Sequence, residues 1–165
     1  MRNKGFTLIE ILFSISIFAL MIGGIASFWH LMIVSQTRQR VMSEVEQEGL
    51  FVMNVITQTI RNADSIVLPS IGSSDSMISL DVSDAILGPV IFDSISGSVK
   101  IKEGSGSYIS LTSSHVILSH LEFYNISPTG SPGAVRIEMT LERANSDNKS
   151  EYEYAKTFYA TAGLR

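Results

Sequence analysis

The 165-residue sequence contains no cysteine, little proline and no excess of positive charge. Without cysteine there is no disulfide, thiol nucleophile or cysteine-ligated metal, so core packing and strand pairing alone must hold a folded domain together. The four prolines all follow position 68, which leaves the first part of the chain free of helix breakers. A formal net charge of −4 argues against nucleic acid as a partner.

Acidic and basic residues are also missing from a long N-terminal stretch. Between Ile11 and Val34 there is no Asp, Glu, Lys or Arg, and His30, beside Trp29, is the only ionisable side chain. The apolar run over residues 6–34 predicts a helix of roughly 40 Å, longer than the ~30 Å hydrocarbon core of a membrane. A secretory signal peptide has an apolar region of only about 7–15 residues. We therefore expect a transmembrane helix, with Trp29 and His30 near the membrane interface.

The few charges that precede this run set its expected orientation. Arg2 and Lys4 lie just before it, so the positive-inside rule predicts a cytoplasmic N-terminus and a C-terminal domain outside. Glu10 does not suit a simple anchor, because a carboxylate near the bilayer centre costs about 2.5–3.5 kcal/mol, though less near an interface. The apolar run contains no cation to offset this cost. A partner is expected from another chain, or from a new amino terminus created by cleavage.

The hexapeptide Gly5-Phe6-Thr7-Leu8-Ile9-Glu10, after a short basic leader and before an apolar helix, resembles the prepilin signature of type IV pilins and pseudopilins. The resemblance implies that a prepilin peptidase removes residues 1–5 by cleaving between Gly5 and Phe6 and then N-methylates Phe6. It implies that Glu10 pairs with the N-terminal amine of a neighbouring subunit. It also implies a bacterial inner-membrane location, an inner-membrane assembly platform, and extraction into a filament of pilin or pseudopilin subunits.

One feature departs from the family pattern. Major pilins commonly carry a proline deep in the apolar helix, whereas this chain has Ser27 at the corresponding position. The neighbouring pair Gly23-Gly24 has two interpretations, and both remain open. It weakens the helix, since glycine costs about 1 kcal/mol relative to alanine, or it allows close helix packing in the membrane.

The helix is expected to continue over residues 35–62 as an amphipathic segment ending near Arg61. Apolar residues recur there at helical spacing: Val41, Met42, Val45, Gly49, Val52, Met53, Ile56 and Ile60. Charged and polar residues occupy the remainder: Arg38, Arg40, Glu44, Glu46, Glu48 and Gln58. This pattern is typical of a helix that covers a sheet, and the broad apolar face disfavours a coiled coil.

Residues 63–165 predict a β-rich periplasmic or extracellular head domain. Short alternating runs are typical of strands: 78–82, 99–101, 109–111, 116–118, 121–123, 135–141 and 152–158. A linker is expected at 69–76 and a hairpin at 145–149. The predicted fold class is α+β and pilin-like, with a long N-terminal helix packed on antiparallel strands that form either one sheet or two. The layout loosely resembles the larger minor subunits: the J-type pseudopilin of type II secretion and the W-type minor pilin.

The head domain contains few residues in patterns typical of metal binding or catalysis. His115 and His120, five residues apart, would point to opposite faces of one strand, which disfavours a shared metal. Acidic residues in a Ser-rich stretch lack the spacing of a calcium loop: Asp75, Asp81, Asp84 and Asp93. No catalytic or phosphate-binding motif is present. We therefore predict no catalytic residue, cofactor or metal, and no enzyme activity.

The sequence is best interpreted as a structural minor pilin or pseudopilin subunit at the tip of a type IV pilus or a type II secretion pseudopilus. Two alternatives remain: a major pilin, and a signal-anchored adhesin or receptor that does not polymerise. The partners expected for the leading interpretation are prepilin peptidase, other subunits, the assembly platform and the lipid bilayer.

Overall fold

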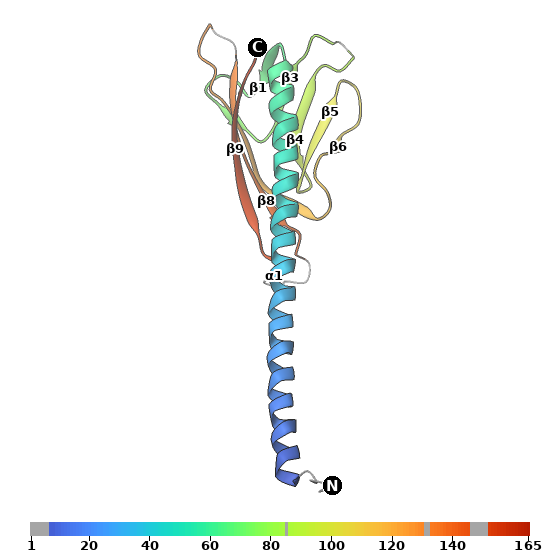
Figure 1. Cartoon of the computed structure of the whole chain (residues 1–165). Helices are drawn as coiled ribbons and strands as arrows, with labels where there is room; N and C mark the ends of the chain where they lie inside the picture. Colours follow the sequence, from blue (N-terminus) through green and yellow to red (C-terminus); the bar gives the residue numbers. More distant parts are fainter. Residues whose placement is uncertain (1–6, 85, 131–132, 146–151) are drawn as a thin grey trace. The chain divides into compact units, whose positions relative to one another are not determined.

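The computed structural model describes residues 7–84, 86–130, 133–145 and 152–165. A single helix, α1, runs from Leu8 to Asn62 (Figure 1). It begins where the carbonyl of Thr7 accepts hydrogen bonds from the N–H groups of Glu10 and Ile11, at 3.1 and 3.3 Å. No proline interrupts it, and it ends one residue after the predicted Arg61. The chain divides into two compact units, residues 1–39 and residues 40–165.

The unit formed by residues 40–165, called the head unit here, contains the C-terminal part of α1 and all the described strands. The strands are β1 (Ser65–Leu68), β2 (Ser74–Asp75), β3 (Ile78–Asp81), β4 (Val90–Ile95), β5 (Ser98–Glu103), β6 (Ile109–Ser110), β7 (Val116–Asn125), β8 (Ala134–Arg143) and β9 (Ala155–Gly163). They form two antiparallel sheets, with strand orders β1-β3-β4-β5-β6 and β2-β7-β8-β9. The predicted α+β class and antiparallel pairing are confirmed.

Several local predictions need correction. The runs 116–118 and 121–123 form one strand, β7, which stays continuous through a register shift between Leu118 and His120. His115 lies in the turn before β7, so it does not share a strand with His120. The expected linker at 69–76 ends in β2, which pairs with β7. The hairpin expected at 145–149 falls largely outside the described residues, although β8 and β9 do pair antiparallel.

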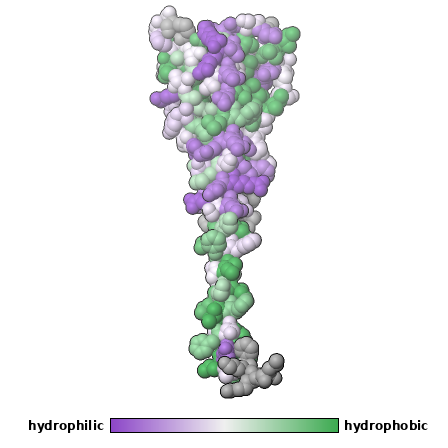
Figure 2. Space-filling view, viewed as in Figure 1, coloured by the Kyte–Doolittle hydropathy of each residue, from purple (hydrophilic) through white to green (hydrophobic). Residues whose placement is uncertain are grey.

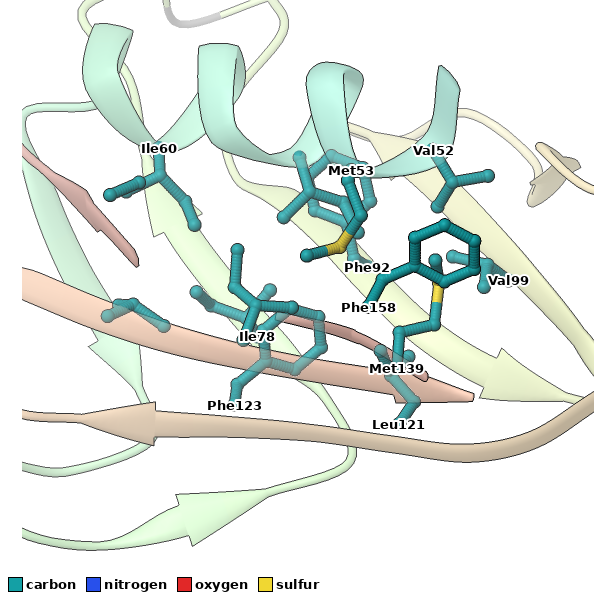
Figure 3. Close-up of a cluster of buried hydrophobic side chains, with 14 of the residues drawn as sticks. Val52, Met53, Ile60, Ile78, Phe92, Val99, Leu121, Phe123, Met139 and Phe158 are labelled. Atoms are coloured by element: carbon teal, nitrogen blue, oxygen red, sulfur yellow. The ribbon is translucent and has the colours of Figure 1, made fainter. Parts of the chain in front are cut away.

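The predicted apolar stripe of α1 forms one wall of the core. Val41, Val45, Gly49, Val52, Met53, Ile56 and Ile60 are buried, while Met42 is half-buried. Figure 3 shows Val52, Met53 and Ile60 projecting from the helix toward side chains of both sheets. Alternation on β8 places Val135, Ile137, Met139 and Leu141 inward, all fully buried. The amphipathic segment therefore covers the sheets, as the sequence predicted.

Close packing of α1 on β9 depends on one glycine. Gly49 is buried, and a Cβ at this position would lie 2.7 Å from Cε1 of Phe158 and closer still to the neighbouring ring atoms. The Phe158 ring is itself only 6% exposed. The missing side chain thus makes room for an aromatic ring against the helix backbone.

Candidate assembly surface

The N-terminal part of α1 exposes its apolar side chains. Every residue from Leu8 to Val34 is exposed, and the fraction reaches 78% at Leu20. Figure 2 shows this apolar surface on the face in view. Among the described residues, α1 is the helix that is long and apolar enough to cross a membrane. Hydrophobic side chains in such numbers require a bilayer or other helices around them.

Three hydroxyls in or just after this segment form local hydrogen bonds. The hydroxyls of Ser16, Ser27 and Thr37 donate to the carbonyls four residues earlier, at 2.9, 2.9 and 3.0 Å. Such a bond reduces the cost of placing a hydroxyl in lipid, because its donor is then paired within the helix. Ser27, at the position where major pilins commonly have proline, therefore sits in uninterrupted helix.

Glu10 differs from these hydroxyls because it carries a full charge. It lies in the first turn of α1 and is exposed. The next Lys or Arg along the helix is Arg38, about 42 Å away at 1.5 Å per residue. The partial positive charge of the helix N-terminus favours a carboxylate here, but it does not neutralise a full charge in lipid. The predicted site residues Arg2, Lys4, Gly5 and Phe6 lie outside the described residues.

Three carboxylates on the C-terminal part of α1 contact strands and a loop of the head unit. Glu44 forms an ion pair with Arg143 at the end of β8. Glu46 forms an ion pair with Lys156 on β9 and accepts a hydrogen bond from the Tyr154 hydroxyl at 3.3 Å. Glu48 accepts hydrogen bonds from the backbone N–H of Ser113, at 3.0 Å, and from its hydroxyl. These contacts fasten the helix on either side of its apolar stripe.

Sequence reasoning placed these glutamates on the polar face but did not find their partners. The available signal was the spacing of acids at 44, 46 and 48, which flanks the apolar stripe on both sides. Their partners are about 65–110 residues away in sequence. Only the packing of the strands brings them to the helix.

The ion pair between Glu46 and Lys156 predicts a pH dependence of stability. The hydrogen bond and charge of Lys156 lower the pKa of Glu46 below its usual 4.5. The hydrogen bond to Glu46 raises the pKa of Lys156 above its usual 10.5. Their contribution is therefore complete between about pH 4.5 and 10.5, and it is lost as the pH falls through the lowered pKa or rises through the raised one.

We expect Lys156→Met to weaken the loss of stability on acidification, as measured by urea unfolding of the full chain in detergent between pH 3 and 7. Some acid dependence should remain, because the hydrogen bond from the Tyr124 hydroxyl lowers the pKa of Glu122. Lys102→Met is the matched control, since its ammonium lies 5.8 Å from the centroid of the Tyr108 ring. If Lys156→Met left the loss of stability on acidification unchanged, the predicted contribution of the Glu46–Lys156 ion pair would be contradicted.

No group of three or more His, Asp or Glu side chains placed to hold a metal occurs within the described residues. His120 approaches one carboxylate, with its Nε2 3.5 Å from Oε2 of Glu122. The aspartates considered for calcium are spread over strands and loops of the first sheet and over β2.

Comparison with known proteins gives one match. Residues 1–26 match the family model described as the prokaryotic N-terminal methylation motif. The match spans the expected leader and cleavage site and residues 6–26 of the apolar segment, so it includes Gly5, Phe6 and Glu10. No curated protein and no solved structure matches the chain significantly.

Proposed function

From the prepilin signature of the type IV pilin family, which this chain carries at residues 1–26, we propose that it is a minor pilin or pseudopilin subunit. Prepilin peptidase cleaves between Gly5 and Phe6 and methylates Phe6. The chain then assembles near the tip of a pilus or secretion pseudopilus. Its role is structural, with no catalytic activity.

The observation that carries this proposal is the exposed apolar surface of residues 8–34 with Glu10 in its first turn. A lipid bilayer covers such a surface before assembly, and the same segments of neighbouring subunits cover it afterwards. Cleavage creates a positively charged amine at Phe6, four residues from Glu10. Each of these charges is costly alone in lipid, and pairing between subunits in register offsets the cost.

The proposed membrane topology follows from the leader. Arg2 and Lys4 hold the N-terminus in the cytoplasm, and the head unit lies outside the inner membrane. Removal of the leader takes both basic side chains away from this end of the helix. The assembly platform can then extract the processed chain into a filament.

A minor role is favoured by the uninterrupted helix around Ser27, where a major pilin commonly has proline. Abundance tests this choice: sheared filaments should contain this chain as a small fraction of their subunits. Filaments made mostly of this chain would assign it the major role. A chain that is processed and yet absent from every filament would favour the non-polymerising alternative.

Processing gives the most direct test of the proposal. On co-expression with a prepilin peptidase, N-terminal sequencing should find N-methylated Phe6 as the first residue. Gly5→Val should block this step, because a side chain at the cleavage site crowds the protease subsite, whereas the control Lys4→Arg should be processed. A wild-type chain that retains Met1 beside an active peptidase would overturn the proposal.

A further inference from the structure

Strand β9 forms one edge of the second sheet, and in the described part of the chain no strand pairs with its outer side. In strand order it is the last member of β2-β7-β8-β9, and among the described residues it pairs with β8 alone. The pairing runs from Ala155 to Gly163 without a register shift. The other edge strands are much shorter: β1 has four residues, and β2 and β6 have two each.

The direction of the free backbone groups follows from two hydrogen bonds. The N–H of Leu164 donates to the carbonyl of Gly133, and the carbonyl of Tyr154 accepts from the N–H of Arg143. The backbone groups of Leu164 and Tyr154, which are both even-numbered, therefore point toward β8. Because the N–H and C=O of one residue in an antiparallel strand point to the same side, odd-numbered residues face away from β8. The edge thus presents the backbone groups of Ala155, Thr157, Tyr159, Thr161 and Gly163.

This edge lacks the features that usually prevent strand addition. It contains no proline and no bulge, and its one charged residue, Lys156, points to α1 and pairs with Glu46. The side of β7 that faces away from β8 differs from this edge, because loop residues form hydrogen bonds with its backbone. The N–H of Leu118 donates to the carbonyl of Gly97, and that of Asn125 donates to the carbonyl of Ser73.

Near this edge, the outer face of the sheet carries carboxylates and therefore favours a positively charged partner. One cross-strand row runs Glu122, Glu138, Tyr159, so two carboxylates are direct neighbours. Among the described residues Glu138 has no ion pair; the Tyr159 hydroxyl lies 3.4 Å from its Oε1. The Tyr159 side chain is 68% exposed at the end of the row.

The adjacent row shows how a cation fits this face. Arg136 on β8 lies over the ring of Tyr124 on β7, with its Cζ 4.5 Å from the ring centroid. A basic residue on a strand added beside β9, about 4.8 Å away, would repeat this arrangement over Tyr159. It would also bring positive charge toward Glu138.

We propose that the β9 edge binds an extended segment of another protein, which adds a strand to the sheet and places an Arg or Lys opposite Tyr159. Backbone hydrogen bonds along the edge hold the segment, and the basic side chain sets its register. This interaction uses the head unit alone. It therefore stands whether or not the apolar part of α1 assembles into a filament.

A strand appended to the full chain tests whether the edge accepts such a segment. An Asn-Gly turn after Arg165 joins an alternating Thr/Val strand that carries either Arg or Glu opposite Tyr159. Hydrogen–deuterium exchange is measured in detergent at the outward amides of Thr157, Tyr159 and Thr161. The Arg form should slow their exchange about tenfold relative to the unextended chain, and about fivefold more than the Glu form.

Two controls separate edge pairing from general stabilisation. The inward amides of Ala160 and Ala162 already face β8, so their exchange should change little. Thr161→Pro removes an outward donor without breaking the β8–β9 ladder and should reduce the protection gained by the appended strand. Equal exchange in all forms, or protection by the Glu form equal to that by the Arg form, overturns the proposal.

Photo-crosslinking from position 157 then tests the natural partner in cells. The captured peptide should be an extended segment with a Lys or Arg within reach of Tyr159. Capture of a segment without a basic residue, or no capture, counts against the proposal.

Discussion

Phe158→Ala should lower the free energy of unfolding of the head unit by about 3–5 kcal/mol, the usual range for a buried phenylalanine. The ring is 6% exposed and packs on the helix at Gly49, so its loss leaves a cavity between α1 and β9. A typical domain is stable by only about 5–15 kcal/mol. Urea unfolding of the full chain in detergent, followed by the near-UV signal of the head, measures the change.

The same ring reverses the expected effect of a second substitution. In an ordinary helix Gly→Ala stabilises by about 1 kcal/mol. Gly49→Ala should instead destabilise by about 1–3 kcal/mol, because the new methyl group overlaps the Phe158 ring. In the Phe158→Ala background, Gly49→Ala should become neutral or stabilising.

Gly24→Ala is the matched control for this reversal. It lies in the same helix with nothing within 4 Å of the position its Cβ would take. It should leave unfolding of the head unit unchanged. If Gly49→Ala destabilised equally with and without the Phe158 ring, close packing would not be the reason for this glycine.

Glu10→Ala should lower incorporation into filaments at least tenfold, while cleavage and membrane insertion continue. The substitution leaves the amine of a neighbouring subunit without its partner, and an uncompensated buried charge costs about 3–5 kcal/mol. The measurement compares processed protein in the sheared filament fraction with that in the membrane fraction, in cells with the assembly machinery.

Two further variants define the role of the carboxylate. Glu10→Asp retains the charge on a shorter side chain and should assemble better than Glu10→Ala. Ser14→Ala, another change of an exposed polar residue in the same segment, should have little effect. Normal incorporation of the Glu10→Ala chain would remove the basis for pairing between this carboxylate and the N-terminal amine.

Local patterns were sufficient to predict the helix and its two kinds of surface. The absence of proline before Pro69 allows one uninterrupted helix, and the absence of charge from Ile11 to Val34 makes its first part apolar on every side. The stripe from Val41 to Ile60 predicted which face would be buried. These features depend on residues within a few positions of one another, so sequence spacing alone reveals them.

Strands were harder to predict where their residues do not alternate or are few. In β4, Val90 and Phe92 are buried and Ile91 between them is half-buried, but all three are apolar, so the sequence shows no alternation of apolar and polar residues. β1 and β2 are short, and β2 pairs with β7 although about 50 residues separate them. Such segments become strands because a neighbouring strand supplies hydrogen bonds, and that neighbour is chosen by the whole fold.

The sequence by itself therefore determined the apolar anchor, the isolated carboxylate at Glu10 and the amphipathic face that covers the head. Only the tertiary structure decided that Phe158 would meet Gly49, that Lys156 would pair with Glu46, and that β9, among the described residues, would pair on one side only. The physical reason is the range of the interactions. Hydrophobic periodicity is local to one helix or strand, whereas side-chain pairing and strand order depend on residues that only folding brings together.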